Sequence, residues 1–425
     1  MHIGFYFESV KQEGGAYQVA LNHLEALRDI QNHEFIIFNT SLDFPFDDFK
    51  NLPNFKIIDL IKRPKNKTEE NPSPTSTAQK KQNLKRKVVL FFLDILRFFH
   101  LYRLENFLAR FKARARAKIF DGYGLDLLLF HGTSELSIYT NIPSVVIIHD
   151  IHHRLYPQFP EMSEKGQWTK REYTYSRIDK NTFRIYVDSE VGKEDLARVY
   201  NIDPKKIVIL RPLPPPYIRT EISQSELVEI RKKYNLPEKF LFYPAQFWPH
   251  KNHKNLVLAA KILRDQGVTV PIVLVGSKKE LWGEYDRVVN LVKESGLERQ
   301  VLFLGFVPIE DISPLYRLAT GLIMPVYVGW TYVPIVEAWA MECPIIYSTA
   351  RGCREQGGDS ALYVDPYKPE DIALKIKEFW QNPQLRATLI ENGKLRLAAW
   401  TRKDFNSTIE NVINEFEQQK HHSSK

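Results

Sequence analysis

The chain has 425 residues, a formal net charge of +8, 44% hydrophobic residues and 26% charged residues. These are proportions of a soluble globular protein, and the length predicts two or three domains. Only Cys343 and Cys353 are present, which excludes a disulfide framework and favours a reducing cytoplasm. No apolar run reaches ~18 residues and the start "MHIGFYFES" lacks a basic leader, so we expect neither a spanning helix nor a signal peptide.

The first half of the chain predicts strands that alternate with helices. A strand in "IGFYFES" is followed by a glycine loop and a helix in "GGAYQVALNHLEALRDI", where Val19, Leu24 and Leu27 recur at helical spacing. Further strands, short and apolar, are predicted at residues 34–40, 55–61, 125–132, 143–150 and 184–190.

Residues 62–118 interrupt this alternation. Residues 62–82 are polar and proline-bearing, so we expect a disordered insertion. Residues 83–118 predict a basic amphipathic helical region; between Lys80 and Lys118, twelve basic residues face only two acidic ones. Such a segment suits an anionic membrane surface, or it packs its apolar face inside the N-terminal domain; both alternatives stay open. No known nucleic-acid reader motif accompanies the charge, so we expect no nucleic-acid partner.

The second half repeats the alternation after a proline-rich connector at residues 212–216. Strands are predicted at residues 239–246, 271–277, 300–306, 321–326 and 344–349. Helices are predicted between them at residues 252–266, 284–296, 311–320 and 334–343. Strands that alternate with helices of ~10–15 residues indicate parallel sheets covered on both faces. Two such sheets are expected to face each other across a cleft, with ligands at the carboxyl ends of the strands.

Glu337 is a carboxylate in the largely apolar run "PVYVGWTYVPIVEAWAMECPII". It lies one turn inside a helix that Pro334 is suited to begin, and the unpaired N–H groups of such a helix end suit a phosphate. A carboxylate at this place can accept two hydrogen bonds from a vicinal diol such as a ribose. The alternative is an ordinary acidic residue that the helix dipole favours in the first turn.

Lys251 opens a helix after the strand and aromatic loop of "FYPAQFWPHKNHKNL". A lysine at such a turn can place its ammonium over a diphosphate, and an ordinary exposed lysine is the alternative. His250 and His253 have no adjacent acidic third ligand, so we expect no metal site there.

His149 ends a predicted strand in "VVIIHDIHHRLYP" and would point into the cleft, where it either contacts substrate or serves as a structural histidine. The potential ligands of "HDIHH" are too crowded to face one ion. The sequence also lacks an Asp-x-Asp pair, a P-loop, a Gly-x-Ser-x-Gly motif and a Gly-x-Gly-x-x-Gly motif. We therefore expect neither a bound metal nor a cofactor.

Together these segments resemble glycosyltransferase family 4, retaining enzymes of the GT-B fold. The resemblance runs through "GGAYQV", "HDIHHRLYPQFP" and "VDSEVGKEDLARVY" and is strongest from "FYPAQFWPHKNH" to "SALYVDP". It implies an acceptor-side domain at residues 1–211 and a nucleotide-sugar-binding domain at 212–397. A C-terminal helix at 398–425 would cross back to the first domain.

The resemblance also implies roles for individual residues. Lys251 would bind the donor diphosphate, Glu337 the nucleotide ribose, and His149 the donor sugar near the reacting carbon. The other donor-binding residues that it implies lie at the ends of predicted strands or in the loops that follow them: Gly14, Gly15, Gly276, Gly305, Phe306, Val307, Thr331, Tyr332 and Val333.

Two positions depart from the family pattern. The motif's first glutamate should fall at residue 329, and this chain has Gly329; the usual arginine should fall near residue 246, and this chain has Gln246. The first departure removes a carboxylate that would bind a sugar hydroxyl, and the second removes a positive charge. We hypothesise that Arg211, at the connector, partly replaces that charge.

The predicted function is the transfer of a hexose or deoxyhexose, of mannose, rhamnose or glucose type, from a nucleotide sugar. The acceptor would be a glycan or a lipid-linked glycan in polysaccharide synthesis, and the transfer would be retaining and metal-independent. The predicted location is cytoplasmic, with peripheral attachment to the inner face of the membrane as an option. Two alternatives stay open: a non-catalytic sugar-binding relative, which Gly329 and Gln246 would permit, and a sugar-nucleotide 2-epimerase.

Overall fold

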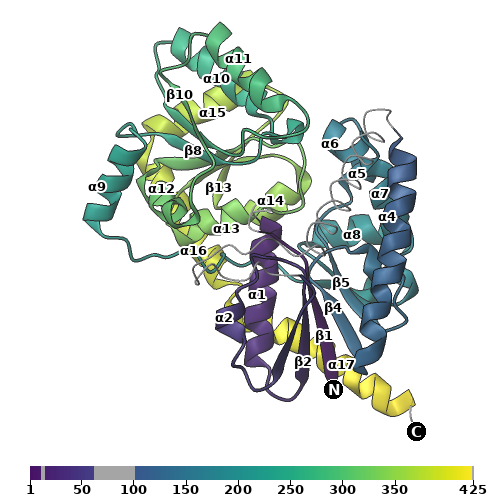
Figure 1. Ribbon diagram of the computed structural model, residues 1–425. Helices are drawn as coiled ribbons and strands as arrows, with labels where there is room; N and C mark the ends of the chain where they lie inside the picture. Colours follow the sequence, from purple (N-terminus) through teal and green to yellow (C-terminus); the bar gives the residue numbers. More distant parts are fainter. Residues whose placement is uncertain (11–14, 62–100, 424–425) are drawn as a thin grey trace, which may run out of the picture.

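Two parallel β-sheets form the centre of the protein. The computed structural model describes residues 1–10, 15–61 and 101–423. A seven-stranded sheet has the order β3-β2-β1-β4-β5-β6-β7, and a six-stranded sheet has the order β10-β9-β8-β11-β12-β13. Helices cover both sheets, and the two units stack one above the other (Figure 1). This confirms the predicted α/β class with two parallel-sheet domains.

Apart from residues 207–209 and 361–364, where no strand was predicted, the strands lie close to where the sequence predicts them. Those of the N-terminal sheet are β1 His2–Phe7, β2 Glu34–Asn39, β3 Phe55–Asp59, β4 Leu127–Phe130, β5 Ser144–Ile148, β6 Thr182–Val187 and β7 Ile207–Ile209. Those of the C-terminal sheet are β8 Leu241–Pro244, β9 Ile272–Val275, β10 Val301–Gly305, β11 Gly321–Met324, β12 Ile345–Ser348 and β13 Ala361–Val364.

The helices of the N-terminal unit are α1 Gly15–Asp29, α2 Phe46–Phe49, α4 Tyr102–Ala117, α5 His152–Leu155, α6 Pro160–Ser163, α7 Gln167–Tyr175 and α8 Glu190–Tyr200. The C-terminal unit and the tail contain α9 Gln224–Lys233, α10 His253–Asp265, α11 Glu284–Glu294, α12 Ile312–Leu318, α13 Val333–Ala340, α14 Arg351–Gly357, α15 Pro369–Gln381, α16 Pro383–Ala398 and α17 Arg402–Ser423. Short 3₁₀ turns are η2 Lys118–Tyr123, η3 Glu135–Ile138, η4 Ile178–Lys180, η5 Pro204–Lys206, η6 Pro249–Lys251 and η7 Ile309–Asp311.

Apolar runs explain why these strands are buried on both faces. In β5 all five residues of "SVVII" are buried, because helices cover each side of a parallel sheet. The N-terminal sheet accordingly has one hydrophobic cluster on each face, and the C-terminal sheet has a single larger cluster.

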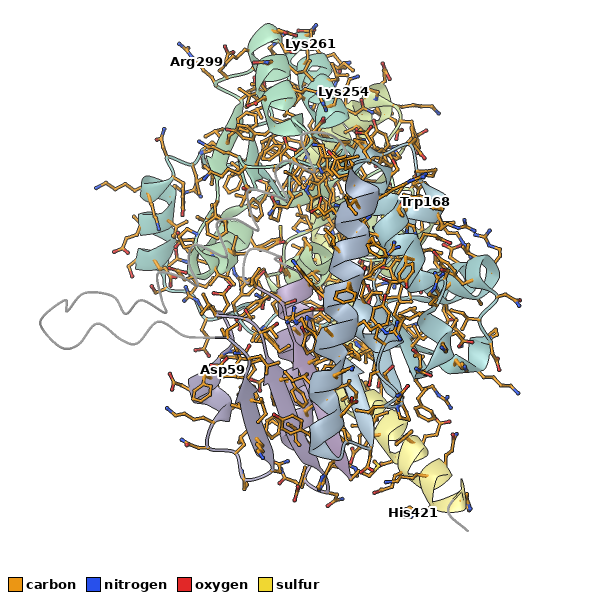
Figure 2. The ribbon with its side chains drawn as sticks, turned by 45° about the vertical axis from the view of Figure 1, so that its right-hand side comes forward. Asp59, Trp168, Lys254, Lys261, Arg299 and His421 are labelled. Carbon is orange, nitrogen blue, oxygen red and sulfur yellow. The ribbon has the colours of Figure 1, made fainter. Side chains whose placement is uncertain are left out.

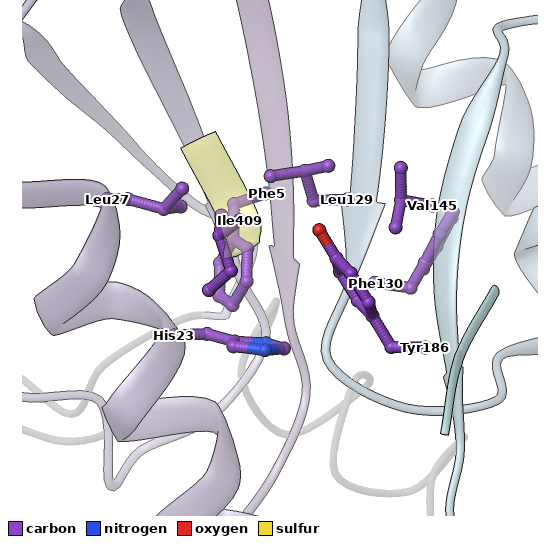
Figure 3. A pocket seen from close by; sticks show the side chains of 8 residues that line it. All are labelled: Phe5, His23, Leu27, Leu129, Phe130, Val145, Tyr186 and Ile409. Carbon is purple, nitrogen blue, oxygen red and sulfur yellow. The ribbon is translucent and has the colours of Figure 1, made fainter. Parts of the chain in front are cut away.

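The tail returns to the N-terminal unit. Phe405, Ile409 and Ile413 of α17 are buried in the cluster that β1 and α1 also form. Figure 2 shows His421, near the end of α17, at the far end of the molecule from Lys261 of α10. A cavity of about 10 Å³ remains where Ile409 meets His23 of α1 (Figure 3), and it has room for about one water.

The predicted insertion at 62–82 and the first part of the basic region, up to residue 100, lie outside the described residues. The remainder of the basic region forms α4, which lies along the outer side of the N-terminal unit (Figure 1).

Each sheet has one place where the strand order reverses. In the C-terminal sheet this place lies between β8 and β11, and in the N-terminal sheet between β1 and β4. Ligands of doubly wound sheets bind outside the carboxyl ends of the strands at such a point. The loops after β8, β11 and β1 are therefore the first places to look for a site.

Candidate active site

Lys251 lies at the strand-order reversal of the C-terminal sheet. It ends η6, between β8 and α10, as the sequence predicts. The turn is fixed from both sides: Tyr243 donates its hydroxyl to the Lys251 carbonyl at 2.7 Å, and the Asn252 amide donates to the carbonyls of Pro325 and Pro366, each at 2.7 Å. Hydrogen bonds thus hold the lysine backbone in place before any ligand arrives.

The Lys251 ammonium has no carboxylate partner among the described residues. Its Nζ lies 3.9 Å from the centroid of the Tyr332 ring. Burial lowers the pKa of Lys251 to about 7, although Asp150 and Glu161 oppose the shift. A positive charge that is desolvated and unpaired favours an anionic ligand, because an incoming phosphate would form charge-assisted hydrogen bonds with it.

Tyr332 occupies the space next to Gly329. A Cβ atom on Gly329 would lie 2.3 Å from Cε2 of Tyr332, so the ring packs directly against the glycine backbone. The Tyr332 hydroxyl donates to the Val328 carbonyl. The Tyr332 N–H donates to Gln356 Oε1 at 2.9 Å, and Gln356 Nε2 donates back to the Tyr332 carbonyl at 2.9 Å. The backbone N–H of Tyr332, a residue expected to bind the donor, therefore has a protein partner in this structure.

Glu337 lies in α13 with 4% of its surface exposed. Each carboxylate oxygen accepts a hydrogen bond from a tyrosine: Oε1 from Tyr217 of the connector and Oε2 from Tyr316 of α12, the latter at 2.7 Å. Burial raises the pKa of Glu337, and both tyrosine bonds oppose the shift. Because an ionised carboxylate has about four acceptor positions, two remain for a diol.

His149 and Thr331 come together from different domains. His149 follows β5, and its Nδ1 lies 3.3 Å from Oδ2 of Asp188, which follows β6. Thr331, in the loop after β11, donates its hydroxyl to the same oxygen at 3.3 Å. The sequence predicts His149 and Thr331 as donor-binding residues, and Asp188 links them.

The glycine loops expected near the base gather at the carboxyl edge of the C-terminal sheet. Gly276 donates its N–H to the Gly305 carbonyl at 3.0 Å, and a Cβ on Gly276 would lie 2.3 Å from the Ala245 carbonyl oxygen. Gln246 Oε1 accepts the Ser277 N–H at 3.2 Å. Beside them, Val307 is buried and Phe306 is exposed.

Gly15 comes close to the donor loop from the other domain. A Cβ on Gly15 would lie 3.4 Å from Cγ2 of Val333, the first residue of α13. The predicted residue Gly14 lies outside the described residues. The first loop of the N-terminal unit and the beginning of α13 are therefore neighbours.

Arg211 has its contacts elsewhere, in the tail of the chain. It is exposed, its guanidinium lies 5.8 Å from the centroid of the Trp400 ring, and its carbonyl accepts the Trp400 indole N–H at 3.0 Å. The contacts recorded for the described residues do not join Arg211 to Lys251, so its proposed role at the diphosphate has no geometric support.

The histidines beside Lys251 have structural partners. His250 Nδ1 lies 2.6 Å from Oε1 of Glu161 on α6, which also accepts the His250 N–H at 2.9 Å. His253 stacks on Tyr243 and Phe247, with ring centroids 4.7 and 4.5 Å apart. Among the residues that the structure describes, no group of three His, Cys, Asp or Glu side chains is arranged to hold a metal ion.

Sequence comparison assigns the family of the C-terminal domain. Residues 228–396, which include Lys251, Gly329 and Glu337, match the family of glycosyl transferases group 1. The protein is a glycosyltransferase with a group 1 domain. An O-antigen chain mannosyltransferase of Escherichia coli is 24% identical to this glycosyltransferase over 62% of the chain and 68% of the relative. An O-antigen chain mannosyltransferase of Salmonella typhimurium is 28% identical over 56% of the chain and 61% of the relative.

A solved structure confirms the predicted GT-B fold of this glycosyltransferase. The Anabaena HepE protein, crystallised with UDP and glucose, aligns with a TM-score of 0.65 and 17% identity. The alignment covers 97% of this chain and 99% of HepE, so it includes both domains.

Several residues of the site were not predicted. Asp188, Trp330, Glu161 and the two tyrosines on Glu337 make contacts between elements that are distant in the sequence. One of these contacts had a signal: Gly192 interrupts a good helical pattern, and a helical glycine often marks a close approach. A Cβ on Gly192 would lie 2.8 Å from Cε3 of Trp330.

Proposed function

We propose that this glycosyltransferase moves a hexose or deoxyhexose from a nucleotide-diphosphate sugar to a glycan or lipid-linked acceptor, with retention and without a metal. The observation that carries the proposal is the Lys251 ammonium, which lies at the strand-order reversal without a carboxylate partner among the described residues. A diphosphate would supply the negatively charged partner that this ammonium lacks.

The proposed chemistry is electrostatic. The bond between the anomeric carbon and the donor phosphate oxygen breaks, and the acceptor oxygen bonds to the same carbon from the same face. The acceptor proton passes to the departing diphosphate. Lys251 stabilises the negative charge that develops on that diphosphate, Glu337 holds the ribose, and His149 contacts the sugar.

A mannose-type donor is the first to test. Two relatives are named O-antigen chain mannosyltransferases, which favours mannose and a polysaccharide acceptor for this chain. Because the identities are only 24% and 28%, glucose-type and rhamnose-type donors belong in the same experiment.

The test is a donor-consumption and transfer assay with GDP-mannose, UDP-glucose and dTDP-rhamnose, with and without EDTA. We expect one donor to turn over equally in EDTA, and Lys251→Ala to lower turnover by about 10²–10³-fold. Glu337→Gln, which keeps the shape of the buried side chain, should weaken donor binding. Lys254→Ala, an exposed lysine on α10 (Figure 2), is the matched control and should change neither quantity.

Three outcomes would contradict the proposal. Loss of activity in EDTA would refute the metal-free mechanism. Binding of a nucleotide sugar without turnover of any donor would favour the non-catalytic relative. Formation of an epimeric sugar nucleotide without an acceptor would favour the epimerase.

We also propose that α4 attaches the enzyme to the inner face of an anionic membrane. Phe107 and Phe111, one turn apart, are 61% and 71% exposed, and the exposed Arg103, Lys112 and Arg114 flank them. Each basic residue near an anionic bilayer contributes ~1 kcal/mol, and the phenylalanines would enter the interface. In the described part of the chain, no helix is long and apolar enough to cross a membrane.

Sedimentation with vesicles of phosphatidylglycerol and phosphatidylcholine tests the attachment. Phe107→Asp with Phe111→Asp should abolish sedimentation, and high salt should weaken it in the unmodified protein. The matched control replaces Leu374 and Leu395 of the C-terminal domain with Asp, since these are also exposed, at 60% and 70%. Equal sedimentation of the two double variants would refute the role of α4.

A further inference from the structure

Asp188 and His149 are neighbours because of strand register. In the parallel pair of β5 and β6, Ile148 lies opposite Val187, and these are the last residues of their strands. The next residues, His149 and Asp188, therefore leave the sheet side by side at its carboxyl edge. Their contact, 3.3 Å between Nδ1 and Oδ2, follows from the sheet rather than from a mobile loop.

The contact determines which ring nitrogen of His149 carries a proton. An ionised carboxylate only accepts hydrogen bonds, so the Nδ1 atom that faces Asp188 must be protonated. The other ring nitrogen, Nε2, is buried and has no hydrogen-bond partner in this structure. Within His149, Nδ1 thus has a protein partner, whereas Nε2 has no hydrogen-bond partner.

Thr331 connects this pair to the other domain. Its hydroxyl donates to the same Oδ2 atom at 3.3 Å, and it lies in the loop that also carries Gly329 and Tyr332. The two domains must be in contact for this bond to form. The orientation of His149 and the position of the donor loop are therefore coupled through one oxygen atom.

We propose that Asp188 is a positioning residue that holds His149 by its Nδ1–H and so presents Nε2 to the nucleotide-sugar donor, with Thr331 completing the arrangement when the domains are in contact. The proposal deepens the proposed function and rests on it where it names the donor. Neither Asp188 nor this pairing follows from the sequence motifs.

The surroundings of His149 agree with this role. Burial lowers the pKa of His149, but Asp188 and, more weakly, Asp150 and the nearby His131 backbone raise it, and the net shift is upward. The His131 backbone nevertheless makes no hydrogen bond of 3.5 Å or less with Nε2. His131 and His23, the other titratable groups that interact with His149, have pKa values lowered to about 4 and about 3. Both are neutral near pH 7, so the carboxylate of Asp188 dominates the protonation of His149.

The first measurement needs no donor. Imidazole ¹⁵N–¹H spectra of the full chain, with the His149 signals assigned through His149→Gln, report its tautomer and pKa. We expect a proton on Nδ1, and we expect Asp188→Asn to lower the pKa of His149 by about 1 unit or more. Asp179→Asn is the matched control, because Asp179 is an exposed carboxylate of the same domain, 2.7 Å from Lys206.

The second measurement is the pH dependence of kcat/KM. Asp188→Asn should move the acidic limb, which protonation of Nε2 sets, to lower pH by the same amount as the change in the spectra, which a purely structural role would not do. Thr331→Val should lower kcat but leave the Nδ1 tautomer in place. Asp188→Glu, a second variant in case the first fails to fold, should keep the raised pKa but lose activity, because the longer side chain displaces the ring.

An unchanged His149 tautomer and pKa in Asp188→Asn would overturn the proposal. A lowered pKa without any movement of the pH profile would also overturn it, because His149 would then not act on the donor. If the spectra change as expected and the unmodified enzyme turns over no donor, the proposed function fails while the Asp188–His149 pairing stands.

Discussion

Trp330 joins the two domains, and its contact with Gly192 supports a quantitative prediction. The tryptophan belongs to the donor loop of the C-terminal domain, yet it is 2% exposed and packs within a hydrophobic cluster of the N-terminal domain. Its indole N–H donates to Asp195 Oδ2 at 3.1 Å. Gly192 of α8 leaves room for the ring, because a Cβ there would lie 2.8 Å from Cε3.

We predict that the effect of Gly192→Ala on stability changes sign when the Trp330 ring is removed. In an ordinary helix, Gly→Ala stabilises by ~1 kcal/mol, whereas overpacking a buried contact costs ~1–3 kcal/mol. Gly192→Ala should therefore be destabilising by a net ~0–2 kcal/mol in the unmodified protein. Trp330→Ala alone should weaken the interdomain contact by ~3–5 kcal/mol. Once the ring is gone, Gly192→Ala should stabilise α8 by up to ~1 kcal/mol.

Hydrogen exchange of the α8 amides measures the contact locally, which a global melt of two domains would not. The single variants should exchange faster at α8, and Gly192→Ala should slow exchange in the Trp330→Ala background. Gly122→Ala, where a Cβ would meet nothing within 4 Å, is the control. If Gly192→Ala has the same sign in both backgrounds, the ring and the glycine do not constrain each other and the reasoning fails.

Three further predictions concern the site and the core. Gly329→Ala should clash with Tyr332 and cost ~1–3 kcal/mol in urea unfolding, whereas the same change in a Tyr332→Ala background should cost little. Because burial lowers the pKa of Lys251 to about 7, calorimetry should show the affinity for a nucleoside diphosphate falling about tenfold per pH unit above that value. Burial lowers the pKa of His23 to about 3, so the folded state keeps it neutral; stability should be complete above ~6.5 and fall toward pH 3, by about 2 kcal/mol between pH 6.5 and 5. His131, with a pKa lowered to about 4, contributes to the same loss, so His23→Leu should reduce the slope in urea unfolding by the His23 share only; a slope equal to that of the unmodified protein would contradict this.

The fold was accessible from the sequence because its signals are local. The apolar runs of β5 and β11, and the helix that follows Lys251, are read from periodicity within a few residues. Parallel sheets then follow from the alternation, whereas the reversal points required the strand order that the structure gives. The positions of Lys251 and Glu337 at helix beginnings were predicted on the same basis.

The partners of these residues were not accessible, because they depend on contacts between distant elements. The sequence predicts Glu337 as a diol ligand but not its two protein partners, Tyr217 just after the connector and Tyr316 of α12. In the sequence, Arg211 is a positive charge next to the connector. In the structure its guanidinium lies 5.8 Å from the centroid of the Trp400 ring of the tail. Neither pairing has a spacing that a sequence pattern would reveal.

Gly329 has a structural role beside Lys251 that the sequence does not reveal. In the sequence, Gly329 is only a glycine at the position where the family pattern has a glutamate. In the structure its missing Cβ is the condition for Tyr332 to lie where it does, with its ring face 3.9 Å from Lys251 Nζ. The glycine thus leaves room for an aromatic neighbour of the ammonium. An aromatic face attracts the ammonium without adding a compensating negative charge, so the charge that Lys251 carries below its pKa of about 7 remains for an incoming diphosphate.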